Sequence, residues 1–220
     1  MTTLMPQLNS DLGELADRVR ESLVQVVVGS AGSGSGVVLA ADGLVVTNAH
    51  VVGGRKDARS ARDLKVILPS GQVRSARLLA KDENLDVAAL RIEADEGILP
   101  DLNPIELGDS KALRVGQWVM AMGNPWGVAG VAAAGIVIGV GPDLPEAPGA
   151  GREWIVVDLA LRPGHSGGPL VDHRGHLIGM STMMAGLEVG MAVPAHVISG
   201  FVASVRSGDA DAEPGDSTLV

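Results

Sequence analysis

Short apolar runs separated by polar turns fill most of the chain. The runs are rich in valine and other β-branched residues, which favour extended strands. Predicted strands lie at residues 23–28, 36–40, 44–47, 64–68, 72–80, 87–92, 117–122, 131–140, 177–182 and 189–193. An Asp42-Gly43 pair between two of these runs is typical of a tight hairpin. The pattern therefore predicts an all-β protein.

Helical periodicity is confined to the two ends of the chain. Apolar residues recur at helical spacing over residues 11–22, which predicts a short amphipathic helix. Ser10 ahead of this run and Glu14 within it predict a capping box that starts the helix. Residues 194–206 predict a closing helix, since proline suits a first helical turn. Residues 207–220 are polar and acidic without apolar periodicity, and we expect them to be disordered.

Composition narrows the class of protein. The 220 residues are 46% apolar and 20% charged, which is typical of a soluble globular chain with an ample core. One Phe, three Trp and no Tyr mean that this core depends on aliphatic side chains. A net charge of −9 argues against nucleic-acid binding. With no cysteine, the chain has no disulfide bond.

Targeting signals are not visible in the sequence. Residues 1–20 lack a basic region followed by a continuous apolar run, as a secretory signal requires. No stretch of about 20 apolar residues is present to span a membrane. We therefore expect a cytoplasmic protein without a membrane partner. A periplasmic or other extracytoplasmic location is the alternative if a leader was removed.

The stretch with the clearest chemistry is residues 162–170, with the sequence RPGHSGGPL. Here Ser166 has glycines on both sides, which permit sharp turns and close approach of other groups. The flanking prolines fix the chain on either side of the turn. An exposed hydroxyl near converging backbone N–H groups is what a nucleophile and its oxyanion hole need. A glycine-rich turn with an incidental serine is the alternative interpretation.

A serine hydroxyl becomes a good nucleophile only with a base, and the base works best when a carboxylate orients it. Among five histidines, His50 stands out because it ends an apolar strand just before a turn. His165 adjoins the serine and is expected to point away from it. Asp86 is a lone carboxylate at the head of an apolar strand, where a half-buried acid needs a hydrogen-bonding partner. Alternatively, Asp86 caps a turn together with Asn84.

Short sequence blocks accompany these three residues in a fixed order. They are GSGVV at 34–38, ADG at 41–43, VTNAHVV at 46–52, LDVAALRI at 85–92, LGDS at 107–110, VGQWV at 115–119, MGNPWG at 122–127 and GHSGGPL at 164–170. The order and spacing resemble HtrA/DegP-type serine proteases, a branch of the trypsin-fold peptidases, over roughly residues 20–200. The absence of cysteine favours this branch over disulfide-bonded secreted trypsins.

The resemblance implies a fold and a set of catalytic roles. The fold is two six-stranded antiparallel β-barrels, chymotrypsin/trypsin-like, with short N-terminal and C-terminal helices. Ser166 would be the nucleophile, His50 the general base and Asp86 the carboxylate that holds the imidazole tautomer. The backbone N–H groups of Gly164 and Ser166 would form the oxyanion hole.

A specificity pocket also follows from the resemblance. Its substrate-binding residues would be Ala160, Leu161, Ser181, Thr182 and Met183. Residues 160–161 and 181–191 carry a single charge, Glu188. We therefore expect the pocket to accept Val, Ala, Leu or Met rather than Arg or Lys.

We expect one trypsin-like protease domain over residues 1–206, with an N-terminal barrel at about 23–95 and a C-terminal barrel at about 105–193. HtrA-like proteins often carry a PDZ domain after the protease, and residues 207–220 leave no room for one. The last three residues, Thr218-Leu219-Val220, resemble a C-terminal ligand for PDZ domains, although such short matches are frequent by chance.

One residue departs from the family pattern. The family usually has Asn before the nucleophile, where this chain has His165. We expect this change to be tolerated, because the preceding side chain points away from the serine. Trypsin-like zymogens instead have an Asp there, which pairs with a newly cut N-terminus. Activation by N-terminal insertion is therefore not expected.

The function expected from these observations is that of a serine endopeptidase. It would cleave unfolded or exposed polypeptides through an acyl-enzyme, in protein quality control, without a metal or cofactor. The alternative is a latent or non-catalytic peptide-binding, chaperone-like module, since HtrA-like sites can rest disassembled. An α/β-hydrolase esterase is disfavoured, because its order of Ser, Asp and His is the reverse of the order here. Trimers are usual in the family, so the resemblance allows a homo-oligomeric assembly for this chain.

Overall fold

The computed structural model describes residues 4–29, 32–53, 64–94, 99, 101–142, 151–184 and 189–208. The side chains of residues 183 and 184 are not among the described parts. The first half comprises α1 (Leu4–Arg20), β1 (Leu23–Val28), β2 (Gly32–Ala40), β3 (Leu44–Thr47), β4 (Leu64–Ile67), β5 (Val73–Asp82) and β6 (Val87–Ile92). The second half comprises η2 (Ser110–Ala112), β7 (Trp118–Gly123), η3 (Pro125–Gly127), β8 (Val131–Gly141), β9 (Trp154–Asp158), β10 (Pro169–Val171), β11 (Leu177–Met184), β12 (Val189–Pro194) and α2 (Ala195–Ser207).

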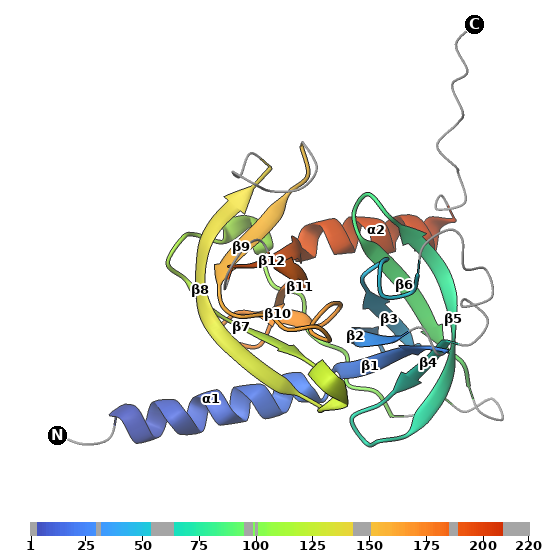
Figure 1. Ribbon diagram of the computed structural model, residues 1–220, viewed down its shortest axis with the longest axis horizontal. Helices are drawn as coiled ribbons and strands as arrows, with labels where there is room; N and C mark the ends of the chain where they lie inside the picture. Colours follow the sequence, from blue (N-terminus) through green and yellow to red (C-terminus); the bar gives the residue numbers. More distant parts are fainter. Residues whose placement is uncertain are drawn as a thin grey trace, which may run out of the picture.

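The strands form two closed barrels side by side (Figure 1). The first barrel has the order β1-β2-β3-β6-β5-β4, and the second has β7-β8-β9-β12-β11-β10 around its ring. All of these pairings are antiparallel, and the second ring repeats the connectivity of the first. The all-β fold with two six-stranded barrels is therefore confirmed.

Aliphatic side chains fill three buried clusters. One lies inside the first barrel and includes Val26 and Leu90. A second lies inside the second barrel and includes Ile155 and Leu159. The third combines residues of both barrels and both helices around the fully buried Trp154. Because this shared cluster crosses from one barrel to the other, burial of apolar area holds the barrels together as well as closing each one.

Helix α1 is longer than the sequence predicts. It begins at Leu4, so Ser10 lies in the middle of the helix and the predicted capping box is wrong. The Ser10 hydroxyl instead donates to the Glu14 carboxylate one turn later, on the exposed surface. Only Leu15 and Val19 of this helix are buried. Its C-terminal half contacts β7, and its N-terminal half projects away from the barrels (Figure 1).

The closing helix α2 is confirmed, and it lies across both barrels (Figure 1). It contacts β11 and β12 of the second barrel and β6 of the first. It ends at Gly208, which adopts a left-handed conformation with φ of 82°, a usual C-terminal cap. Of the helices in the described ranges, none has the length and apolarity needed to cross a lipid bilayer.

Three strands differ from the predicted pattern, and one of them, β9, was not among the predicted strands. β2 begins at Gly32 rather than at the predicted residue 36, because residues 32–37 pair in register with β1. β10 was not predicted, since it is only three residues long and begins with proline. The tail at residues 207–220, which is expected to be disordered, falls largely outside the described residues.

Candidate active site

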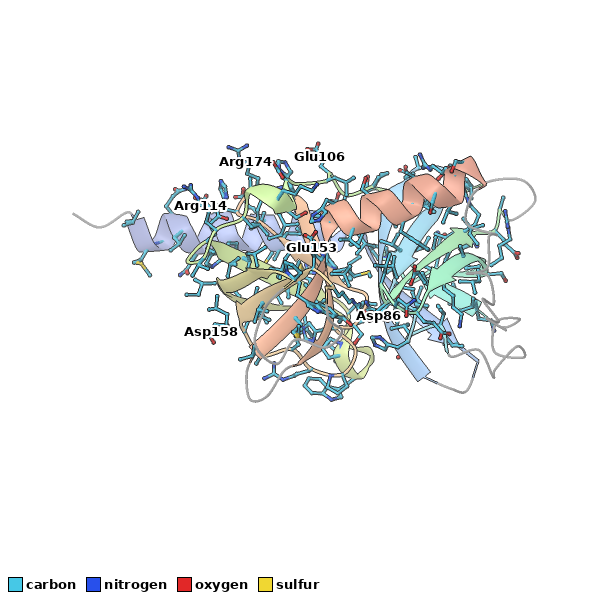
Figure 2. The ribbon with its side chains drawn as sticks, turned by 90° about the horizontal axis from the view of Figure 1, so that it is seen from above. Asp86, Glu106, Arg114, Glu153, Asp158 and Arg174 are labelled. Atoms are coloured by element: carbon cyan, nitrogen blue, oxygen red, sulfur yellow. The ribbon has the colours of Figure 1, made fainter. Side chains whose placement is uncertain are left out.

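The expected catalytic residues lie where the two barrels meet. His50 follows β3 and Asp86 immediately precedes β6, so the first barrel carries both. Ser166 precedes β10 of the second barrel. Figure 2 shows Asp86 at the junction between the barrels. The site therefore depends on how the barrels are packed against each other.

The structure brings His50 and Asp86 together. The His50 ring nitrogen Nδ1 is 2.9 Å from Asp86 Oδ2 and 3.0 Å from Oδ1. The backbone N–H of His50 also donates to Asp86 Oδ1, at 3.0 Å. A ring that faces a carboxylate through Nδ1 keeps its proton there and leaves Nε2 to act as the base.

The backbone at Asp86 is unusual. Its φ of 55° lies in the left-handed region, which costs a residue with a side chain about 1–3 kcal/mol. The Asn48 side chain donates to the Asp86 carbonyl at 3.0 Å and holds this conformation. The preceding turn is capped by Asp82, whose Oδ1 accepts the N–H groups of Asn84 and Leu85. The alternative in which Asp86 itself caps a turn with Asn84 is therefore wrong.

Asp86 is buried and yet has a lowered pKa. Burial acts to raise the pKa of this carboxyl group. Hydrogen bonds from the His50 ring, the Thr182 hydroxyl and the His50 N–H, together with the charge of His50, outweigh that effect. The Thr182 hydroxyl donates to Asp86 Oδ2, so the second barrel contributes to the hydrogen-bonded environment of the carboxylate. Asp86 therefore stays ionised to lower pH than an ordinary aspartate.

Ser166 has a different partner from the one expected. Its hydroxyl donates to the carbonyl oxygen of Thr182 at 2.8 Å. Among the hydrogen bonds of the described residues, none joins Ser166 to the His50 ring. The hydroxyl must give up its bond to the Thr182 carbonyl before His50 can take its proton.

The segment before Ser166 forms a tight turn. The N–H of His165 donates to the carbonyl of Arg162 at 2.9 Å, and Gly164 has a φ of 106°. A turn with Pro163 followed by a glycine at positive φ is of type II. A side chain at Gly164 would place its Cβ 2.5 Å from the Pro125 Cα, so only glycine fits.

His165 points into the protein, as expected. Its side chain is fully buried, and its Nδ1 lies 3.2 Å from the backbone nitrogen and 3.1 Å from the carbonyl oxygen of Arg162. Its Nε2 has no hydrogen-bond partner in the described part of the chain. Burial lowers the pKa of His165, so the ring is neutral at neutral pH.

The residues expected to line the specificity pocket lie on the second barrel. Ala160 is half-buried, and Leu161 is buried against Gly190 of β12, whose added Cβ would be 3.1 Å from Leu161 Cδ1. Ser181 and Thr182 are buried on β11. Met183 is also on β11, but its side chain is outside the described parts, as is Glu188. The preference for apolar substrates stays a prediction.

Three polar residues around the site were not found from the sequence. Ser35 and Asn124 are buried and bond to each other and to the turn at Gly164. Arg152 donates to the carbonyl of Leu85, beside Asp86, at 2.6 Å. The sequence carries no signal for them, because each acts through contacts with residues far along the chain.

Comparison with known proteins decides the family. The sequence pattern of the family described as Trypsin-like peptidase domain matches residues 34–180, which is more than half of the chain. The chain belongs to the trypsin-like peptidase family. This membership agrees with the two barrels and with the juxtaposition of His50 and Asp86.

Several members of the trypsin-like peptidase family are similar to this chain. Protease Do-like 1, chloroplastic, from Arabidopsis thaliana is 38% identical over 179 residues, 78% of this chain and 38% of that protein. Serine protease HTRA2, mitochondrial, from Bos taurus is 38% identical over 172 residues, 77% of this chain and 35% of that protein. The chain thus spans less than half the length of these relatives. The resemblance to HtrA/DegP-type proteases is confirmed.

A solved structure of the same type is also similar. The HtrA-type protease AlgW, solved with a tripeptide, superposes with a TM-score of 0.76 at 29% sequence identity. The match covers 89% of this chain and 64% of that chain. The whole described fold of this chain therefore has the architecture of an HtrA-type protease domain.

Proposed function

We propose that this chain is a serine endopeptidase that cleaves unfolded or exposed polypeptides, in the manner of a quality-control protease. The single observation that carries the proposal is the His50–Asp86 pair, with Nδ1 held 2.9 Å from the carboxylate. Thr182 links this pair to Ser166, because its hydroxyl donates to Asp86 and its carbonyl accepts the Ser166 hydroxyl. The similarity to named serine proteases supports it. One protease domain over residues 1–206 is part of the proposal, and the compartment stays a prediction.

In this mechanism Ser166 attacks the peptide carbonyl and His50 Nε2 takes the hydroxyl proton. Ionised Asp86 stabilises the resulting imidazolium and keeps its Nδ1–H oriented. The N–H groups of Gly164 and Ser166 receive the oxyanion of the tetrahedral intermediate. His50 then donates the proton to the leaving amine. In the second half of the reaction, water attacks the acyl-enzyme while His50 takes a proton from the water, and His50 then returns a proton to the Ser166 oxygen as the acid product leaves.

A second candidate function rests on the resting position of the nucleophile. The Ser166 hydroxyl donates to the Thr182 carbonyl. A chain that keeps this bond would hold peptides in the cleft without turnover. This is the latent, chaperone-like module, and labelling with a fluorophosphonate probe, described next, distinguishes it from an active protease.

The test uses the full chain with a fluorophosphonate probe and unfolded-protein substrate. We expect stoichiometric labelling of the wild type at Ser166, loss of labelling in Ser166→Ala and at least about 10³-fold loss of hydrolysis in His50→Ala. Circular dichroism of each variant controls for folding. Peptides with Val, Ala, Leu or Met before the scissile bond should be cut in preference to those with Arg or Lys. A folded wild type that neither labels nor hydrolyses contradicts the protease and supports the latent module.

A further inference from the structure

Ser35 of the first barrel contacts the nucleophile turn of the second barrel at two points. It lies in β2 and is fully buried. Its hydroxyl donates to the carbonyl oxygen of Gly164 at 2.7 Å, and its backbone N–H donates to the carbonyl oxygen of Ser166 at 2.8 Å. One residue thus holds the carbonyls of both residues whose N–H groups are proposed to form the oxyanion hole.

The direction of the Ser35 hydroxyl is fixed by its other neighbour. The backbone N–H of Asn124 donates to Ser35 Oγ at 2.9 Å, and the Asn124 side-chain amide lies 3.3 Å from it. Both of these groups are donors, so they occupy the oxygen lone pairs of the hydroxyl. Its single proton therefore points at Gly164, which is the one acceptor among these partners.

Asn124 is itself tied to both barrels. Its side-chain amide donates to the carbonyl of Val24 in β1 at 3.0 Å. Its side-chain oxygen accepts the N–H of Gly130 at 3.1 Å. Asn124 therefore holds the Ser35 hydroxyl in place relative to both the first barrel and the loop after β7.

The surroundings leave little room for rearrangement. A Cβ added at Gly123 would be 2.7 Å from the His165 Cα and 3.1 Å from both the Gly164 carbonyl and the Ser35 hydroxyl. A Cβ added at Gly167 would be 2.1 Å from the Ser35 carbonyl. The backbone of the turn therefore packs directly on β2 and on the end of β7.

We propose that Ser35 is a positioning residue that holds the oxyanion hole in its reactive geometry. Gly164 has no side chain and can adopt many backbone conformations, so its orientation depends on what binds its carbonyl. Anchoring that carbonyl fixes the Gly164–His165 peptide unit, which lies between the two peptide units that carry the N–H groups of Gly164 and Ser166. This restricts how those two N–H groups can turn. The inference rests on the proposed hydrolytic function, and it adds a residue outside the triad.

The variant Ser35→Ala removes the hydroxyl bond to the Gly164 carbonyl and leaves the longer bond from the Asn124 N–H to that carbonyl, at 3.2 Å. Ser110→Ala is its matched control. Ser110 is also almost fully buried, and its hydroxyl also has two partners, the His196 ring Nδ1 at 2.8 Å and the His196 N–H at 3.0 Å. Ser110 is the first residue of η2, and it contacts His196 in the first turn of α2. Both variants lose one buried hydroxyl, so a general loss of stability affects both.

Steady-state kinetics test the positioning role directly. Removal of one oxyanion donor costs about 10²–10³-fold in rate, and the turn retains its bond from His165 to Arg162. We therefore expect Ser35→Ala to lower kcat by about 10–100-fold with KM within about twofold. Affinity for a peptide boronate, whose tetrahedral adduct places an oxygen in the hole, should fall by a similar factor. Ser110→Ala should change neither.

Hydrogen exchange gives a second readout that does not require turnover. Ser35→Ala should speed exchange of the amides in residues 162–168 by at least about tenfold, and Ser110→Ala should not. Unchanged exchange in Ser35→Ala, or equal kinetic losses in the two variants, overturns the proposal. An inactive wild type in which Ser35→Ala still speeds exchange contradicts the proposed hydrolysis, while the role of Ser35 in holding the turn stands.

Discussion

Asp86 shows how the site offsets the cost of an unfavourable residue conformation. Its backbone is in the left-handed region and its carboxylate is buried, and each of these destabilises the folded state. Bonds from Asn48 to its carbonyl, and from His50 and Thr182 to its carboxylate, compensate for both. The same bonds fix the His50 ring, so they serve both stability and the proposed catalysis.

His165 gives a prediction at the same scale. Its pKa is lowered by burial, so near pH 6 the unfolded chain binds a proton there more readily than the folded chain. Stability from the neutral ring is fully present above the unfolded pKa of about 6.5 and is lost as pH falls from there through the folded pKa. His165→Asn removes this dependence, so the stability advantage of wild type over the variant should shrink on acidification, by at most about 1.4 kcal/mol per pH unit.

Urea unfolding of wild type and His165→Asn at several pH values between about 7.5 and 5 measures this difference. The exposed His173 provides the control variant, His173→Asn, which should leave the pH dependence of wild type unchanged. A difference between wild type and His165→Asn that stays constant with pH would contradict the buried neutral ring.

At the scale of elements, Arg152 connects the start of β9 to the turn that carries Asp86. Its guanidinium donates to the Leu85 carbonyl at 2.6 Å and lies 4.0 Å from the centre of the Trp154 ring. Burial lowers the pKa of Arg152, and the charges of Asp86 and Asp82 oppose this effect only in part. The bond crosses from the second barrel to the first, so it positions the residue before Asp86.

Arg152→Ala should lower kcat/KM by about tenfold, the factor that corresponds to about 1.4 kcal/mol of lost transition-state stabilisation. It should also lower the free energy of unfolding by about 1–3 kcal/mol, since a hydrogen bond from a charged group and a ring contact are lost. Steady-state kinetics and urea unfolding measure the two effects. Arg91→Ala is the control, because Arg91 also donates to a backbone carbonyl, that of Asp42 at 2.7 Å, but far from the site. Equal losses of kcat/KM in both variants would contradict a positioning role for Arg152.

The sequence predicts elements better than it predicts the contacts between them. Short apolar runs rich in β-branched residues indicate ten of the twelve strands in the described part of the chain, and the block order indicates the candidate triad. The bonds of Ser35 to Gly164 and of Arg152 to Leu85 join residues 129 and 67 positions apart, which no local pattern encodes. The start of α1 was missed for a related reason: Ser10 has a good capping side chain, but nothing local shows that the helix already began at Leu4.

At the scale of the whole molecule, the shared cluster predicts that the two barrels unfold together. Chains of this length often populate intermediates, and two barrels with separate cores would be expected to do so. Here, however, buried residues of both barrels meet around Trp154 and under both helices. Loss of either barrel would expose the apolar surface of the other, so separate unfolding is costly.

The positions of the tryptophans allow joint unfolding of the two barrels to be measured. All three lie in the second barrel, Trp118 in β7, Trp154 in β9 and Trp126 between β7 and β8, so fluorescence reports that barrel while far-ultraviolet circular dichroism reports both. Leu90→Ala, in the core of the first barrel, should destabilise by about 2–5 kcal/mol and shift both signals to the same lower midpoint. Leu159→Ala in the second barrel is the matched control and should also shift both signals together. An early dichroism transition in Leu90→Ala with the fluorescence midpoint unmoved would mean that the barrels unfold independently. The site would then be lost as soon as the first barrel unfolds, while the core of the second barrel is still folded.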